Sequence, residues 1–247
     1  MNNLKVTEVE HYTDNLFRIR TERPSTFRFV AGEFVMIGLD NWSEKLQRNK
    51  PIMRAYSMTS GPYDEFLEFY SIKVPGGPLT SKLQHIKVGD ELIVGDKPTG
   101  TLTLNNIELG GNLWMLATGT GIAPFISILR DPTTFDHFKR VHVVWSVRYQ
   151  EELQAYHKFL QDSKAKYIPT VTRGASYPFQ NKRITDLLND GKLGIRTGRL
   201  DKDNTKVMIC GNMDFNVTIA NYFLTRDWEE GNSKTAGAFV QEKAFVG

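Results

Sequence analysis

The sequence is poor in cysteine, in net charge and in long apolar runs. Its single cysteine in 247 residues excludes an internal disulfide framework, and also an iron–sulfur cluster or zinc site held by several cysteines of this chain. The formal net charge of +3 is too small to indicate nucleic-acid binding, which usually comes with a strong basic excess. A content of 40% hydrophobic and 24% charged residues is typical of an ordinary globular protein.

Little in the chain would direct it to a membrane. The first residues, MNNLKVTEVEHYTD, contain no apolar core like that of a signal peptide. The most apolar stretch, LWMLATGTGIAPFISIL, is interrupted by TGTG, so we expect no membrane span. We therefore expect a cytoplasmic monomer that binds neither nucleic acid nor membranes.

The two halves of the chain differ in pattern. Residues 1–104 contain short alternating apolar runs separated by Gly, Pro, Asp and Asn, which predict an antiparallel barrel or sandwich. These runs are LKVTEVEHY, LFRIRTE, TFRFV, EFVMIGL, RAYSMTS, EFLEFYSIKV and DELIVGDKP, and SKLQHIK is expected to form one short helix. This half alone can bury a core of its own.

From residue 105 onward, apolar runs alternate with helical segments. The runs LWMLAT, VHVVWSV, YIPTVT and KVMICG are followed or separated by APFISILRD, EELQAYHKFLQD, RITDLLNDG and DFNVTIANYFLTRDW. This alternation predicts buried parallel strands in a doubly wound α/β domain. We therefore expect two domains, residues 1–104 and 105–247, joined near TGTLTLNNIELGG.

The segment RAYSMTS combines a strand pattern with an unusual set of polar residues. Arg54 can neutralise a pyrophosphate, Tyr56 offers a flat face to a planar ring, and Ser57 can hydrogen-bond a ring nitrogen. A flat heterocycle joined to a diphosphate is a flavin dinucleotide. The alternative is an edge strand with scattered polar residues.

Two turns can receive phosphate groups. In ATGTGIAP a strand ends in a turn with Gly119 and Gly121 before a helix, where free N–H groups favour an anion. Pro124 stands where the dinucleotide fingerprint has its third glycine, and a plain tight turn explains the segment equally well. In PGGPLTSKL, Thr80 and Ser81 either cap a short helix, which we favour, or bind a phosphate.

Arginines follow successive strands of the second half. Arg148 follows VHVVWSV, Arg173 follows YIPTVT, and Arg183 opens RITDLL. The carboxyl ends of parallel strands form the ligand-binding edge of such sheets, where arginines can bind an extra phosphate. The matching position lacks the acidic residue that an NAD site prefers. For any single arginine a solvated surface residue is the better interpretation, but the set together predicts NADP rather than NAD.

Two more residues are candidates for the reaction itself. Cys210 ends the strand KVMI next to the turn at Gly211, and is either an inert buried thiol or a small side chain placed against a nicotinamide ring. In the apolar tail FVQEKAFVG, Glu242 can carry a proton, and Phe245 can stack on a ring or anchor the terminus. A tail this apolar is expected to be tied down.

Together these segments resemble the bacterial flavodoxin/ferredoxin type of ferredoxin–NADP reductase. The resemblance rests on RAYS, SIKVPGGPLTS, ATGTGIAPF, VR and VTR after strands, CG after the last core strand and EKAFVG, in the order of the family and over nearly the whole chain. It implies a six-stranded antiparallel FAD-binding β-barrel followed by a doubly wound, NADP(H)-binding parallel-sheet domain. It further implies FAD and NADP(H) as cofactors and acidic ferredoxin or flavodoxin as partners.

The resemblance also assigns residues to each role. For FAD it implies Arg54, Ala55, Tyr56, Ser57, Tyr70, Ser71, Ile72, Lys73, Val74, Thr80, Ser81, Lys82, Thr120, Ala244 and Phe245. For NADP(H) it implies Arg148, Thr172, Arg173, Arg183, Gly211, Asn212 and Met213. Ser57, Cys210 and Glu242 are implied at the site of hydride transfer. Because the chain continues past Glu242, either Ala244 or Phe245 would cover the flavin.

Two other functions remain open. An NAD(P)H-dependent reductase component of an oxygenase, or a flavin reductase, would use the same fold. A non-catalytic flavin- or nucleotide-binding regulatory subunit would not need RAYS, CG and Glu242 together. Lys45, Arg48 and Lys50 form a basic stretch before RAYS, which either steers an acidic carrier or is a solvated loop.

Overall fold

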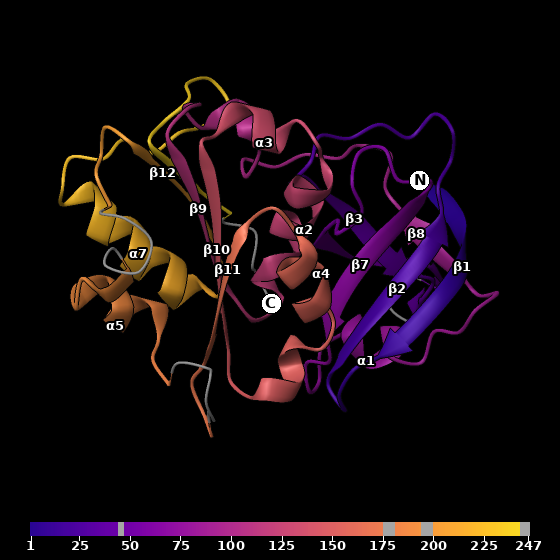
Figure 1. The fold of residues 1–247 in the computed structure, drawn as a ribbon. Helices are drawn as coiled ribbons and strands as arrows, with labels where there is room; N and C mark the ends of the chain where they lie inside the picture. The colour runs from indigo at the N-terminus through magenta and orange to yellow at the C-terminus, as the bar shows by residue number, and fades with distance from the viewer. Residues whose placement is uncertain (44–46, 175–180, 194–199, 243–247) are drawn as a thin grey trace.

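The computed structural model describes residues 1–43, 47–174, 181–193 and 200–242. Two sheets lie side by side, one from each half of the chain, with helices between them (Figure 1). None of the helices in the described ranges has the length and apolarity needed to cross a membrane.

The first half forms a six-stranded antiparallel sheet in the order β6-β3-β8-β1-β2-β7. A bridge between Met58 and Phe69 brings the two edges together, so the sheet closes toward a barrel. Its strands are β1 (Asn2–His11), β2 (Leu16–Glu22), β3 (Phe34–Leu39), β6 (Ile52–Ser57), β7 (Phe66–Ile72) and β8 (Glu91–Val94). The short helix α1 (Thr80–Leu83) and a ribbon of β4 (Trp42–Ser43) and β5 (Arg48–Asn49) complete this half.

One expected strand does not form. Residues 26–30, TFRFV, have no regular structure. Phe27 and Phe29 instead bury their rings in the barrel core. The Arg23 guanidinium donates to the Phe27 carbonyl at 3.2 and 2.9 Å, and so occupies an acceptor that a ladder would otherwise use. Alternating apolar residues therefore reflect burial here, not strand pairing.

The second half forms a five-stranded parallel sheet in the order β11-β10-β9-β12-β13. Its strands are β9 (Asn112–Thr118), β10 (Arg140–Val147), β11 (Lys166–Val171), β12 (Thr205–Cys210) and β13 (Phe239–Gln241). The chain builds outward from β9 in both directions, so the order reverses between β9 and β12. A crevice for ligands is expected at the carboxyl ends of these two strands.

Helices cover both faces of this sheet, which confirms the doubly wound prediction. Figure 1 shows α2 (Ala123–Arg130), α3 (Thr134–His137) and α4 (His157–Asp162) on the side of the barrel, and α5 (Ile184–Asn189) and α7 (Met213–Leu224) on the other side. Short 3₁₀ turns are η1 (Leu104–Asn106), η2 (Gly119–Ile122) and η3 (Gln150–Leu153). The expected helix over EELQAYHKFLQD is broken, because η3 ends at Leu153, a turn follows over residues 154–156, and α4 begins at His157.

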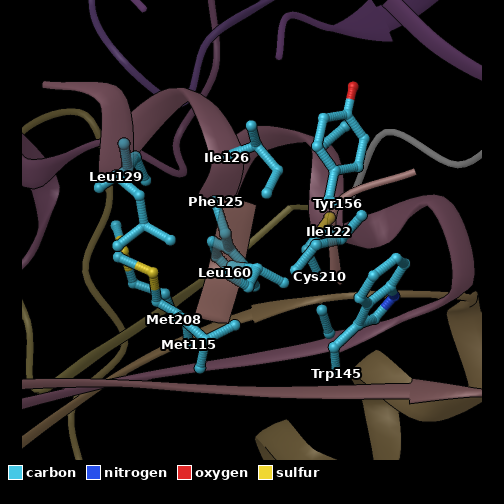
Figure 2. Close-up of a cluster of buried hydrophobic side chains, with 14 of the residues drawn as sticks. Met115, Ile122, Phe125, Ile126, Leu129, Trp145, Tyr156, Leu160, Met208 and Cys210 are labelled. Atoms are coloured by element: carbon cyan, nitrogen blue, oxygen red, sulfur yellow. The ribbon is translucent and has the colours of Figure 1, made fainter. Parts of the chain in front are cut away.

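The core on the barrel side of the parallel sheet also holds side chains of the first half. Figure 2 shows its centre, where Phe125 of α2 and Leu160 of α4 lie above Met115 and Met208 of the sheet. Leu16, Ala31 and Tyr70 of the first half belong to the same buried cluster. The two halves thus share an apolar interface as well as being neighbours.

Candidate functional site

Strand β6, which carries RAYS, is half-buried along its whole length, whereas β7 is mostly buried. The Arg54 guanidinium donates to the Met53 carbonyl at 2.9 Å, and no carboxylate in the described ranges pairs with it. A guanidinium in this position can take a phosphate. Side chains alternate along a strand, so Ser57 points to the opposite face from Arg54 and Tyr56.

The Tyr56 ring packs against the barrel core and its hydroxyl lies 3.0 Å from the Ser71 hydroxyl. Burial raises the pKa of Tyr56 above its usual value, so the phenol stays protonated and available for that hydrogen bond. Ser71 of β7 is thus connected to strand β6 through the Tyr56 hydroxyl. Ile72 and Val74 are exposed.

The loop before α1 differs from our expectation. Helix α1 begins after Leu79, with no side-chain cap, so the favoured capping role of Thr80 and Ser81 is wrong. The Thr80 hydroxyl instead accepts from the Val74 N–H at 3.2 Å and contacts the Val74 carbonyl at 3.3 Å. This hydroxyl closes the glycine-containing loop on itself. Lys82 donates to the side-chain oxygen of Asn41.

The Gly-rich turn packs against β12 at Gly121 and faces open space at Gly119. A Cβ on Gly121 would lie 2.3 Å from the Cys210 carbonyl oxygen, so only glycine fits against β12. A Cβ on Gly119 would meet no atom within 4 Å, and Trp145 holds this residue by donating to its carbonyl at 2.8 Å. Pro124 lies in the first turn of α2, as predicted. This open, glycine-lined turn before a helix fits a ligand's phosphates.

The three residues expected at the site of hydride transfer, Ser57, Cys210 and Glu242, lie in the same region of the molecule. Cys210 is fully buried at the end of β12. The side chain of Glu242 lies beside Gly100, where a Cβ would be 3.5 Å from its Oε2. That same Cβ would be 3.5 Å from Phe34, which pairs with Ser57 between β3 and β6.

Cys210 is not activated as a nucleophile in these surroundings. Burial, and then the Glu242 carboxylate, raise the pKa of the Cys210 thiol well above its usual value, so no thiolate nucleophile forms at neutral pH. The Glu242 N–H donates to the Ile209 carbonyl at 3.1 Å, and Asn216 donates to the Glu242 carbonyl at 2.5 Å. Strand β13, which the sequence did not predict, leads the chain here. Ala244 and Phe245 lie outside the described residues.

Two of the three arginines meet at the carboxyl edge of the sheet. Arg148 and Arg173 are exposed, and the Arg173 N–H donates to the Arg148 carbonyl at 2.8 Å. Thr172 is held between them by donating its hydroxyl to the Val147 carbonyl at 3.2 Å. Arg183 is the N-cap residue of α5, and its N–H donates to Asp186 at 3.3 Å.

None of these three guanidiniums forms an ion pair with a carboxylate of the described chain. They are therefore suited to an anion from solution. Sequence reasoning missed Tyr149, whose exposed ring lies 6.0 Å from the Arg173 guanidinium carbon. An aromatic residue directly after a strand-end arginine was the available signal. Its face can receive a flat base.

The CG turn opens helix α7. A Cβ on Gly211 would lie 2.2 Å from the Thr118 hydroxyl, so the turn packs tightly against the end of β9. Asn212 caps α7 by accepting from the Phe215 N–H at 2.9 Å, and Met213 is exposed. Thr120 lies half-buried in η2 on the same edge. The two turns thus lie together at the carboxyl ends of β9 and β12, where the strand order reverses.

Comparison with known proteins gives a consistent result. Residues 115–220 match the family described as an oxidoreductase NAD-binding domain. The chain is 42% identical to ferredoxin–NADP reductase A of Sorangium cellulosum, covering 98% of this chain and 89% of that protein. It is 45% identical to the flavodoxin/ferredoxin–NADP reductase of Rhodobacter capsulatus, covering 98% and 92%.

A solved structure is similar as well. The crystal structure of a ferredoxin NADP+ reductase from Neisseria gonorrhoeae, with bound FAD and NADP, superposes with a TM-score of 0.90. The two chains are 29% identical, and the match covers 99% of this chain and 98% of that one.

Proposed function

The chain belongs to the ferredoxin/flavodoxin–NADP reductase family, and from this premise we propose how its own residues perform the reaction. It is an FAD-dependent oxidoreductase that moves electrons between NADP(H) and ferredoxin or flavodoxin. When bound, FAD supplies the chemistry, which is two-electron hydride exchange with the nucleotide and one-electron exchange with the carrier. The protein supplies alignment and electrostatics.

The observation that carries the assignment of the flavin site is the half-exposed strand β6. Its Arg54 has no carboxylate partner in the described chain, which supports a contact to the pyrophosphate of FAD. Tyr56 would pack on the flavin, and Ser57, which points to the other face at the very end of β6, would hydrogen-bond near the reactive nitrogen of the flavin. The remaining FAD residues are Ala55, Tyr70 to Val74, Thr80 to Lys82 and Thr120. Residues 1–104 would bind FAD and residues 105–247 NADP(H).

The nucleotide site is supported by the two turns and the exposed arginines. The open side of Gly119 would receive phosphates, and Gly211, Asn212 and Met213 would line the nicotinamide pocket. Arg148 and Arg173, with Thr172 between them and Arg183 nearby in sequence, would bind the 2′-phosphate. Two guanidiniums just after the ends of adjacent strands favour a nucleotide that carries this additional charge.

Cys210 and Glu242 would orient the nicotinamide against the flavin. A protonated thiol is small and neutral, so it can lie against a ring without adding charge. Glu242 would hold a proton or accept a hydrogen bond at the ring edge, kept in place by Asn216. Their role is alignment, because hydride transfer itself requires a close and fixed approach.

We further propose that the protein acts as a cytoplasmic monomer.

Arg48 and Lys50 are exposed on the segment that leads into β6, and would steer an acidic carrier toward the flavin edge. Lys45, the third residue of the expected basic stretch, lies outside the described residues.

The test is an anaerobic titration of the yellow protein with NADPH and then with NADH, followed by visible absorbance. We expect NADPH to bleach the flavin at far lower concentration than NADH. Arg173→Gln should reduce that preference about tenfold, because a charge-assisted hydrogen bond contributes about 1.5–3 kcal/mol. Arg226→Gln, which changes an exposed arginine of the distant turn after α7, is the matched control.

Two results would contradict the proposal in different ways. Equal action of both nucleotides would make the arginines surface residues and favour a reductase component of an oxygenase. A protein that stays colourless with added FAD would refute the flavin site on β6.

A further inference from the structure

The buried carboxylate of Glu68 lies at the interface between the two halves and has no part in the reaction described so far. Glu68 stands in the middle of β7, and none of its side chain is exposed. Burying a charged carboxylate is costly unless it is paired and hydrogen-bonded. Its surroundings show how this cost is offset.

Five side chains contact the Glu68 carboxylate, and they come from both halves. From the barrel, Arg20 donates at 2.5 Å and Arg18 lies at 3.3 Å from Oε2, while Thr59 donates to Oε1 at 2.8 Å. From the second half, Arg130 and Tyr156 each donate to Oε1 at 3.1 Å.

The cluster is charged at neutral pH. Burial by itself would raise the pKa of Glu68, but Arg130, Arg20 and Arg18 outweigh it and bring this pKa below its usual value. Bonds between a carboxylate and guanidiniums are strong and directional. An apolar interface resists separation but tolerates sliding, whereas this cluster specifies one relative orientation of the halves.

The contacts from the second half are rigidly connected to the nucleotide site. Arg130 is the last residue of α2, and the other end of this helix follows the Gly-rich turn η2. Arg130 also pairs with Asp64 at 3.1 Å and lies over the ring of Phe159 in α4. Beside it, Ser127 donates to the Ser60 carbonyl at 2.7 Å.

Tyr156 makes a second connection to the same site. It ends the segment that starts at Arg148, and within this segment the Glu152 carbonyl accepts from the Tyr70 hydroxyl at 3.5 Å. Figure 2 shows the Tyr156 ring beside Ile122 of η2, with its hydroxyl pointing away from the apolar side chains. Both routes from the nucleotide-binding edge therefore end on one oxygen of Glu68.

We propose that Glu68 is a positioning residue for hydride transfer, because its carboxylate fixes the orientation of the nucleotide-binding half relative to the flavin-binding barrel. This inference rests on the proposed function. Helix α2 is about 12 Å long, so a rotation of about 5° around its Arg130 end moves its nucleotide end by about 1 Å. A displacement of about 1 Å can lower a reaction rate about 100-fold.

The kinetic test compares Glu68→Gln and Tyr156→Phe in the FAD-loaded protein. Glu65→Gln and Tyr63→Phe make the same chemical changes at exposed positions of the adjacent loop, outside the cluster. Stopped-flow bleaching by saturating NADPH should be at least tenfold slower in Glu68→Gln and about threefold slower in Tyr156→Phe. The bleaching rates of the two control variants should stay within about twofold of the parent protein. In all four variants the affinity for NADP+ should also stay within about twofold, and the flavin midpoint potential should be unchanged.

A second measurement reports orientation without activity. Nitroxide labels on Val88→Cys in the barrel and Val217→Cys on α7 lie at exposed positions, while the native Cys210 is buried and escapes labelling. Pulsed electron paramagnetic resonance should give a narrow distance distribution in the parent protein. We expect it to broaden or shift in Glu68→Gln and Tyr156→Phe, but not in the two control variants.

The double variant adds a further criterion. If Tyr156 acts through Glu68, the rate of Glu68→Gln with Tyr156→Phe should equal that of Glu68→Gln alone. Independent, multiplying effects would overturn the proposal, as would parental rates and parental distance distributions in the two single variants. If Glu68→Gln does not fold, Tyr156→Phe decides by the same two measurements.

Failure of the proposed function would be recognised separately. It would appear as a parent protein that NADPH does not bleach, and the distance measurement would still decide whether Glu68 fixes the two halves.

Discussion

His142 shows at the residue scale how burial acts on one titratable side chain. It is almost completely buried on β10, its ring stacks on Trp114 at 4.5 Å, and neither ring nitrogen has a hydrogen-bond partner in the described chain. Burial first, and then Lys166 and Arg140, lower the pKa of His142 to about 4 from its usual 6.5. The folded state therefore disfavours the protonated ring.

The sign of the pH dependence follows. Between pH 6.5 and about 4 the unfolded chain binds a proton that the folded protein does not, so the free energy of unfolding falls as the pH drops through this range. The loss attributable to His142 should reach about 3 kcal/mol. Denaturant unfolding at pH 4, 5, 6 and 7 measures it. His142→Phe, which keeps an aromatic ring against Trp114, should flatten this dependence, while His85→Gln at an exposed position should not.

A pH dependence that is identical in His142→Phe and the parent protein would contradict this assignment. The remaining acid sensitivity would then belong to carboxylates such as Glu68, whose lowered pKa also makes stability fall in acid.

At the scale of elements, the Gly-rich turn η2 has one glycine that packs against the sheet and one that faces the ligand side. Gly121 faces the backbone of β12, where a Cβ would lie 2.3 Å from a carbonyl oxygen. Gly119 has φ +52° but faces open space. The two glycines are therefore required for different reasons, although they stand two residues apart in one motif.

Alanine substitutions should distinguish these reasons. Gly121→Ala should lower the free energy of unfolding of the FAD-loaded protein by about 3 kcal/mol, because the β12 backbone cannot move away. Gly119→Ala should cost only about 1 kcal/mol, from the left-handed backbone, yet weaken NADP+ binding by projecting a methyl group into the ligand's space. Urea unfolding and NADP+ titration measure the two effects. Equal destabilisation by both variants would refute the distinction.

At the scale of the whole molecule, charge placement should matter more than net charge. The net charge is only +3, so a patch rather than an overall field must attract an acidic carrier. Arg48 and Lys50 are exposed before β6, which supports such a patch beside the flavin strand.

Replacing both residues by Glu should slow reduction of flavodoxin or ferredoxin about tenfold at low ionic strength. The difference should shrink at high salt, because the screening length falls to about 3 Å at 1 M. The control is the double variant Lys139→Glu with Lys234→Glu, which makes the same change in charge. These two lysines precede β10 and β13, at the amino ends of the parallel strands and away from the nucleotide-binding edge. Salt dependence identical in both double variants would exclude this docking patch.

Much of this protein was predictable from local patterns. The six strands of the barrel sheet and the four long strands of the parallel sheet follow from apolar runs, because the alternation or continuity of apolar residues directly reflects which faces are buried. The Gly-rich turn and Pro124 at the start of α2 were also recognisable, because backbone conformation at glycine and proline is a property of these residues themselves.

Other features were decided only by contacts between distant segments. The irregular path of TFRFV depends on Arg23 and the barrel core, and the short strand β13 forms only because β12 is present to pair with it. The turn that separates η3 from α4 ends at Tyr156, whose hydroxyl donates to Glu68, 88 residues earlier in the chain. Nothing in the local sequence EFLEFYS shows that the Glu68 carboxylate is buried. The sequence determines which residues are apolar, flexible or charged, but a buried charge is stabilised by partners that only the folded chain brings together.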